Sequence, residues 1–381
     1  MKKIITYILA LPLMICAYGC LDENPKDQVD PDAIYNNADN IYKNAVASLY
    51  NYIGSNKESE GLQGTCRGIY DYNTITTDEA MIPIRGGDWD DGGLWENMYK
   101  HQWTANDNYL YDIWKYIYKV IVLSNQSLSV IDSHKNLLST NQITEFTAEV
   151  RAVRALFYYY AMDMFGNIPL VTSYDVPLEQ VVTNKRSEVF KFIVDELQAV
   201  APVLADARSN TPGDYYGRVT RPVAHFLLAK LALNAEIYSD DNWTDGNRPD
   251  GKNIYFTVNG EKKNAWQACI WYCQQLTDEG YELETDYASN FIVHNENSKE
   301  NIFTIPLDKN LYPNEYHYQF RSRHYKHGGA YGCAAENGTC ATVSTVKAFG
   351  YGTSQVDPRF YINFYADEVS VDGNRIYLDN G

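Results

Sequence analysis

The chain has 381 residues, with 49 Asp and Glu against 32 Lys and Arg, and its formal net charge is −17. A surface of this sign repels phosphate backbones, so the composition argues against a nucleic-acid partner. The length allows one large domain, or two ordinary ones, with a substantial hydrophobic core.

The N-terminal segment is typical of an export signal. Two lysines precede an apolar stretch over residues 4–17, and Gly19 and Cys20 follow it. A basic start, an apolar run and small residues at the cleavage end are the layout of a secretory signal peptide. Because Gly19-Cys20 resembles the lipobox of bacterial lipoproteins, we predict that residues 1–19 are removed and that Cys20 carries the lipid. An ordinary signal peptide that is cut nearby is the alternative.

Residues 20–32 are polar and acidic and contain two prolines, which predicts an extended tether. No later segment is continuously apolar over the roughly 20 residues that a membrane-spanning helix needs. The lipid on Cys20 is therefore the predicted attachment to a membrane, and two or three acyl chains on one cysteine anchor a protein stably.

The remaining residues, 33–381, are predicted to form a single, mainly α-helical domain. Apolar residues recur with a helical period in six segments: 31–53, 108–131, 144–165, 187–204, 221–238 and 265–280. The last four form two predicted helical pairs, and their alanines resemble those of tetratricopeptide packing. The domain thus divides into a helical part, 33–240, and a loop-rich part, 241–381, with one predicted strand at 301–306.

A stretch rich in glycine and aspartate, between the first two helices, contains the first candidate binding residues. Trp89 and Trp95 can present a ring to the face of a sugar, while Arg85 and Asp88 supply a donor and an acceptor for hydroxyl groups. The glycines allow an exposed and tightly turned loop. Two alternatives stay open: the tryptophans pack into the helical body, or the aspartates hold a calcium ion, although the spaced ligands of an EF-hand are absent.

A second aromatic cluster lies in the loop-rich part, and its candidate ligand-binding residues are Tyr312, Tyr316, Tyr318 and Arg321. Rings at positions 316 and 318 lie on one side of an extended stretch, because side chains alternate along it. The histidines that follow have no ordered metal-ligand spacing, so we predict neither a metal site nor a cofactor. The sequence also lacks the nucleophile-elbow, phosphate-loop and zinc-protease motifs, and we predict that the protein is not an enzyme.

Five cysteines follow the predicted signal peptide and lipid site, and an odd, scattered set does not form a disulfide framework. Whether Cys333 and Cys340 bridge in an oxidising compartment stays open. Three charged residues, Glu149, Arg151 and Arg154, fall within an apolar helix. We expect them to be structural and paired with opposite charges and backbone carbonyls.

Several segments, in this order along the chain, resemble the SusD/RagB family of outer-membrane nutrient-binding lipoproteins. The most specific is the helix over residues 149–155 with its exit over 165–170, which resembles the family's E-x-R-x-x-R-A helix and F-G-x-x-P-L exit. Further matching segments are the acidic start after Cys20, Trp114 with Tyr118 and Asn125, Gly217-Arg218-Val219-Thr220, and Asp357-Pro358-Arg359.

This resemblance implies a superhelix of tetratricopeptide-like pairs that supports a loop-rich, ligand-binding face. It implies a lipoprotein that faces outward on the cell outer membrane, binds oligosaccharides and delivers them to a SusC-like TonB-dependent transporter. A peptide-binding lid of an oligopeptide transporter, and a structural adaptor without a small ligand, are the alternative functions. Family members usually continue well beyond the Asp-x-Arg motif, so we expect this chain to be incomplete at its C-terminus.

Overall fold

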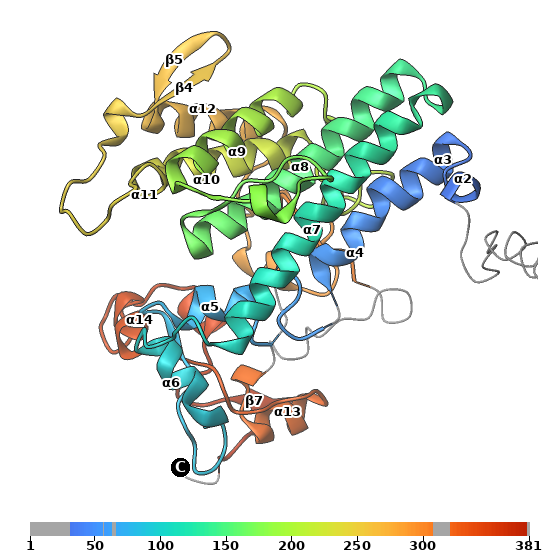
Figure 1. The fold of residues 1–381 in the computed structure, drawn as a ribbon. Helices are drawn as coiled ribbons and strands as arrows, with labels where there is room; N and C mark the ends of the chain where they lie inside the picture. Colours follow the sequence, from blue (N-terminus) through green and yellow to red (C-terminus); the bar gives the residue numbers. More distant parts are fainter. Residues whose placement is uncertain (1–30, 56, 63–65, 308–320, 379–381) are drawn as a thin grey trace, which may run out of the picture.

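The computed structural model describes residues 31–55, 57–62, 66–307 and 321–378. Long helices form one end of the molecule, and short helices joined by loops form the other (Figure 1). The predicted lipid site, Cys20, and three tyrosines of the second cluster, Tyr312, Tyr316 and Tyr318, lie outside the described residues. Among the described helices, none has both the length and the hydropathy required to cross a membrane.

The helical body contains α2 (Pro31–Ile34), α3 (Ala38–Ile41), a π-helical stretch (Tyr42–Ala47), α4 (Ser48–Gly54), α7 (Asn108–Ser133), α8 (Thr140–Phe165), α9 (Arg186–Val200), α10 (Arg221–Leu233), α11 (Ala235–Tyr238) and α12 (Ala265–Asp278). The other described helices are α5 (Ile69–Ile75), α6 (Leu94–Tyr99), α13 (Tyr325–Tyr331), α14 (Val343–Ala348) and α15 (Phe360–Asn363), with short 3-10 turns at Asp91–Gly93, Lys135–Leu137, Leu178–Gln180, Gly251–Asn253 and Tyr287–Phe291.

The described strands are short and form antiparallel pairs. These pairs are β1 (Ala80–Met81) with β6 (Cys340–Ala341), β2 (Ile168–Pro169) with β3 (Thr183–Asn184), β4 (Tyr255–Val258) with β5 (Glu261–Asn264), and β7 (Ser370–Val371) with β8 (Asn374–Arg375). The sequence predicts a strand at 301–306, but the structure has none there, so this prediction is wrong. Ile302, Phe303 and Ile305 instead pack against the core, and their segment pairs with none of the described strands.

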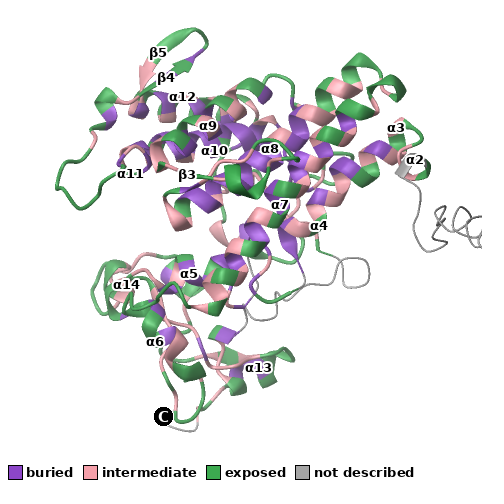
Figure 2. Cartoon of the chain, in the orientation of Figure 1, coloured by how far each residue is buried: buried purple, intermediate pink, exposed green. Residues whose placement is uncertain are grey.

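The two predicted helical pairs are confirmed, because α8 packs on α9 and α10 packs on α12. The buried residues line the inner faces of these helices (Figure 2). Fully buried alanines, including Ala152, Ala155 and Ala232, allow the helices to approach closely. α7 is a second partner of α8, and a short turn reverses the chain between them.

Local sequence explains where α8 begins and ends. The Ser139 hydroxyl accepts a hydrogen bond from the Gln142 N–H, and the Gln142 side chain accepts one from the Ser139 N–H, which caps the start of α8. Gly166, with a φ of +71°, ends the helix, because glycine adopts positive φ values without strain. The predicted helix over 31–53 is instead divided into α2, α3, the π-helical stretch and α4.

The charged residues inside α8 are structural, as expected. Arg154 donates to Glu196 at 2.8 Å, and Arg151 donates to the same carboxylate at 2.6 Å. Burial raises the pKa of Glu196, but the hydrogen bonds from Arg151 and Arg154 outweigh it, so the pKa is lowered overall. Glu149 accepts two hydrogen bonds from Arg218, at 2.9 and 2.6 Å. These ion pairs join α8 to α9 and to the segment before α10.

Candidate functional site

A tight hairpin of the chain presents the first group of predicted binding residues. The backbones of Arg85 and Asp88 exchange two hydrogen bonds of 3.0 Å, and Gly86 turns the chain with a φ of +65°. Trp89 and Asp91 then have φ values of +63° and +41°, a region that side chains rarely adopt. Such residues persist only where surrounding contacts hold them. The hairpin is therefore a fixed feature of the surface.

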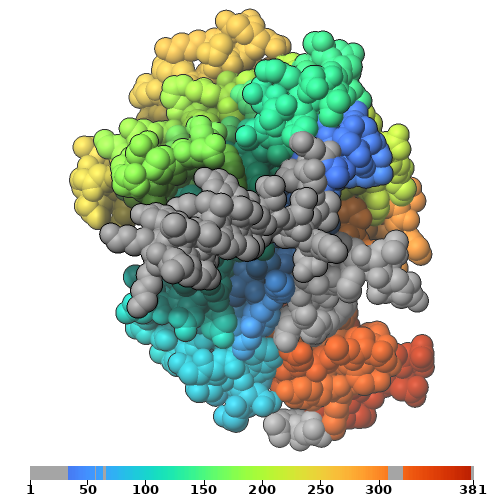
Figure 3. All heavy atoms as spheres, turned by 45° about the vertical axis from the view of Figure 1, so that its right-hand side comes forward, coloured from blue at the N-terminus to red at the C-terminus, as the bar shows by residue number. Residues whose placement is uncertain are grey.

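A cavity of about 300 Å³ lies beside this hairpin. We call it the loop cavity, and its lining residues are Cys66, Arg67, Asp88, Trp89, Asp91, Tyr325 and Glu336. They come from three segments of the chain, 66–67, 88–91 and 325–336, and the last is more than 200 residues from the other two. The space-filling view shows the segment around residue 90 and the segment beyond residue 320 together at the end of the molecule opposite the long helices (Figure 3).

The Trp89 ring lines the loop cavity and is held by a segment almost 250 residues away. Its indole N–H donates to the Glu336 carbonyl at 2.9 Å. Gly338 lies against the ring so closely that a Cβ on this glycine would stand 2.8 Å from two ring atoms. No sequence pattern identifies Gly338 as a partner of Trp89, because only the fold brings these positions together.

Donors and acceptors alternate around the loop cavity. The Tyr325 hydroxyl donates to the Asp88 carboxylate at 2.9 Å, and half of the tyrosine stays exposed. Arg67 donates to Asp91 at 2.9 Å. Carboxylates accept hydrogen bonds from the hydroxyl groups of a ligand, and guanidinium and phenol groups donate hydrogen bonds to hydroxyl oxygens. With two aromatic rings nearby, this arrangement suits a neutral ligand that carries many hydroxyl groups.

Trp95 and Arg321 lie beneath the loop cavity rather than on its surface. Their exposed fractions are 1% and 4%, so neither side chain reaches a ligand in this structure. Trp95 packs edge-on against Trp89, with 6.0 Å between ring centroids, and its N–H donates to Asp91 at 2.7 Å. The sequence predicts that both residues contact a ligand directly. In the structure they instead support the residues above them, because packing and hydrogen bonds hold both side chains below the surface.

Asp71 holds two of these supporting segments in place. Its carboxylate is fully buried and accepts hydrogen bonds from Arg321 at 3.0 Å and from the Arg67 backbone N–H at 2.7 Å. Burial lowers the pKa of Arg321, but the hydrogen bond and charge of Asp71 raise it above its ordinary value. Asp71 therefore fixes two of the segments that form the loop cavity, and no sequence pattern singled it out.

Arg85 does not line the loop cavity. Its guanidinium lies beside the Cys340 thiol and lowers the thiol's pKa, but burial has the larger effect and raises it overall. The predicted contact between Arg85 and a ligand therefore has no support from this geometry. Cys333 and Cys340 are both free thiols, so the bridge that the sequence left open is not formed here.

The Cys66 thiol in the wall of the loop cavity is not activated for nucleophilic chemistry. Burial, followed by the nearby Asp71 charge, raises the pKa of the Cys66 thiol to about 12. The thiol is therefore protonated at neutral pH and is a poor nucleophile. In the part of the chain that the structure describes, no cluster of three or more His, Cys, Asp and Glu side chains is arranged to hold a metal ion.

Known proteins share both the sequence pattern and the fold. A SusD-like family model described as "Starch-binding associating with outer membrane" matches residues 68–233. A "SusD-like protein" of Bacteroides ovatus is 24% identical over 310 residues, which are 80% of this chain and 49% of the relative. The "Starch-binding protein SusD" of Bacteroides thetaiotaomicron is 22% identical over 252 residues, 66% of this chain and 39% of the relative. Over residues 68–233 the chain is thus similar to SusD-like proteins.

A solved structure confirms the predicted fold class of this SusD-like chain. The "Laminarin binding SusD-like protein" superimposes with a TM-score of 0.53 at 22% identity, over 70% of this chain and 50% of the other. The mainly helical, tetratricopeptide-like architecture that the sequence predicts is thus correct. The chain spans about half the length of the first curated relative that it matches, and 39% of the starch-binding one.

Proposed function

We propose that this SusD-like protein binds oligosaccharides at the loop cavity and delivers them to a SusC-like TonB-dependent transporter. In this proposal it is a lipoprotein anchored through Cys20 to the outer membrane and facing outward. The observation that carries the proposal is the geometry of the loop cavity, where the Trp89 and Tyr325 rings stand beside Asp88, Asp91 and Arg67.

The chemistry of the lining supports a sugar as the ligand. A sugar ring has an apolar face, which packs on an aromatic ring, and a rim of hydroxyl groups, which need both donors and acceptors. The loop cavity supplies rings from Trp89 and Tyr325, acceptors from Asp88 and Asp91, and donors from the Arg67 guanidinium. The Tyr325 hydroxyl, which donates its proton to Asp88, offers an acceptor oxygen. Names of relatives that mention starch and laminarin favour the same ligand class.

The lining also supports binding without turnover. Asp91 already accepts hydrogen bonds from Arg67 and Trp95, and Asp88 accepts one from Tyr325. The Cys66 thiol is protonated because burial raises its pKa. A carrier must also release its ligand, so its affinity should be modest. A modest affinity is expected for a sugar, because its polar groups exchange hydrogen bonds with water for hydrogen bonds with protein.

Calorimetric titration of the purified protein with starch- and laminarin-derived oligosaccharides tests this proposal. We expect saturable binding in the micromolar to millimolar range, and chromatography after long incubation should recover the oligosaccharides intact. Cleavage of a bound oligosaccharide would contradict the carrier function. Binding of peptides, with no response to any oligosaccharide, would instead favour the peptide-binding alternative.

A further inference from the structure

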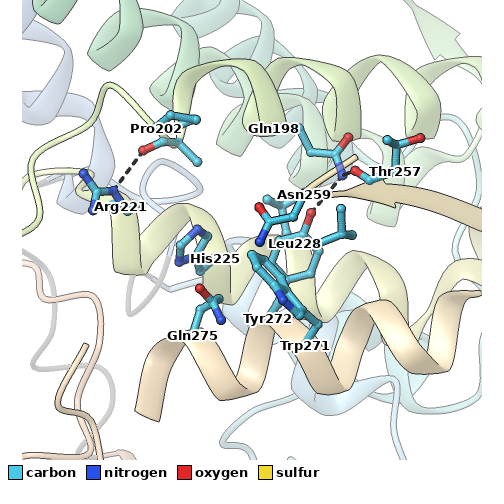
Figure 4. Close-up of a pocket in the computed structure, with 12 residues that line it drawn as sticks. Gln198, Pro202, Arg221, His225, Leu228, Thr257, Asn259, Trp271, Tyr272 and Gln275 are labelled. Atoms are coloured by element: carbon cyan, nitrogen blue, oxygen red, sulfur yellow. Dashed lines mark hydrogen bonds between the residues drawn. The ribbon is translucent and has the colours of Figure 1, made fainter. Parts of the chain in front are cut away.

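A second cavity, of about 380 Å³, lies within the helical body. Its walls come from the end of α9, from α10, from α12 and from the β4–β5 hairpin, and Figure 4 shows side chains of all four elements around one space. We call it the helical cavity, and its lining residues are Gln198, Ala201, Pro202, Arg221, His225, Leu228, Thr257, Val258, Asn259, Trp271, Tyr272 and Gln275. It shares no lining residue with the loop cavity.

Rings on α12 form a rigid aromatic wall of the helical cavity. The Trp271 and Tyr272 rings stand edge to face, with centroids 5.0 Å apart. The His225 imidazole contacts both, at centroid distances of 6.1 and 5.9 Å. Gln198 donates to the Tyr272 hydroxyl at 2.8 Å and to the Thr257 carbonyl at 3.0 Å, which fixes the wall to α9 and to the hairpin. Flat, fixed rings of this kind suit an apolar ligand face.

Uncommitted hydrogen-bonding groups face these rings. Among the described residues, the side-chain amides of Asn259 and Gln275 and the indole N–H of Trp271 make no hydrogen bond with one another or with any other group. Each amide offers two donor hydrogens and one acceptor oxygen. Asn259 occupies the left-handed turn between β4 and β5, with a φ of +50°, so the hairpin presents it at the mouth.

Charges around the helical cavity are balanced by their neighbours. Arg221 donates to the Ala201 carbonyl at 3.2 Å and lies 3.2 Å from the Asp206 carboxylate. The buried His225 imidazole lies 2.9 Å from the Glu279 carboxylate. An acidic ligand would therefore find no unpaired cation here, and the lining favours a neutral ligand.

We propose that the helical cavity is a second carbohydrate site, which holds one or two neutral sugar rings. Its volume equals that of about a dozen water molecules at roughly 30 Å³ each, which is small for a binding pocket. Amide groups facing a fixed indole and phenol match the hydroxyl rim and the apolar face of a sugar. The site goes beyond the proposed function, because it lies in the helical body and does not depend on Trp89.

Indole N–H resonances test the site directly. The protein is labelled with ¹⁵N at tryptophan, in a Trp89→Ala background that removes the ring of the loop cavity and leaves six of the seven tryptophans. The Trp271 resonance is assigned by its loss in Trp271→Phe. Titration with glucose, galactose, mannose and maltose is expected to shift it saturably at millimolar concentrations, and glucuronate is expected to bind more weakly than glucose.

Neighbouring glutamines supply a matched pair of variants. Gln275→Ala removes a lining amide, and we expect the dissociation constant read from Trp271 to rise about fivefold, as for one lost hydrogen bond. Gln274→Ala changes the next, exposed residue, which bonds only Asp278, and should leave the constant unchanged. Asn259→Gly removes the amide on the opposite wall but keeps the left-handed turn, which glycine adopts freely. We expect the dissociation constant to rise by the same factor.

Three results would overturn the second site. They are no Trp271 shift with any of the neutral sugars, equal affinities in Gln275→Ala, Asn259→Gly and Gln274→Ala, or tighter binding of glucuronate than of glucose. The loop cavity is judged separately, by comparing oligosaccharide binding in the wild type and in Trp89→Ala. Failure of one site is therefore distinguishable from failure of the other.

Discussion

Replacing Trp89 with alanine is expected to weaken oligosaccharide binding at the loop cavity at least tenfold. The substitution removes the ring that lines the cavity beside Asp88 and Tyr325. Truncating a central aromatic contact commonly costs about 2 kcal/mol or more, and about 1.4 kcal/mol corresponds to a tenfold change in affinity. Calorimetric titration with the oligosaccharide that binds the wild type most tightly measures the effect.

Trp243 provides the control for this variant. It is 69% exposed, follows α11, and does not line the loop cavity. Trp243→Ala removes the same kind of ring elsewhere and should leave the affinity unchanged. Near-ultraviolet circular dichroism checks that the Trp89 variant keeps its fold. If the wild type and both folded variants bind the oligosaccharide with equal affinity, Trp89 is not part of the binding surface.

Replacing Asp71 with asparagine is expected to lower the free energy of unfolding by about 3–5 kcal/mol. The substitution leaves the buried Arg321 guanidinium without its opposite charge, and removal of one partner from a buried ion pair costs about this much. We also expect weaker oligosaccharide binding, since Asp71 holds the segments of Arg67 and Arg321 beneath the loop cavity. Urea unfolding followed by circular dichroism measures the stability.

Asp39 offers a matched carboxylate on the surface. It pairs with Lys43 at 2.6 Å, but the two side chains are 70% and 63% exposed. Pairs of this kind contribute about 0–1 kcal/mol, so Asp39→Asn should barely change the urea midpoint. If the Asp71 and Asp39 variants unfold at the same urea concentration, the buried ion pair does not stabilise the loop cavity in the way described.

Local signals explain why the helical body was predictable. Helical periodicity marked the segments of α7 to α12, and Gly166 marked the end of α8. Charges on a core-facing helix predicted the pairing that Arg154 makes with Glu196. Each of these signals lies within a few turns of chain, so it can be recognised without the fold.

The candidate site was only partly predictable, because its contacts are long-range. Glycines and aspartates indicated a tight loop that presents Asp88 and Trp89, and both line the loop cavity. The burial of Trp95 depends on Arg321, whose guanidinium lies over the Trp95 ring although the two residues are more than 200 positions apart in the sequence. The support from Asp71 and the close approach of Gly338 depend on the fold in the same way. The apolar segment at 301–306 suggested a strand, but tertiary packing decided its structure.

A crystal structure of the protein soaked with its tightest-binding oligosaccharide tests the central claim most directly. We expect a sugar ring in the loop cavity, packed on Trp89, with hydroxyl groups hydrogen-bonded to Asp88, Tyr325 or Arg67. Oligosaccharide density elsewhere on the protein, with the loop cavity empty, would contradict it.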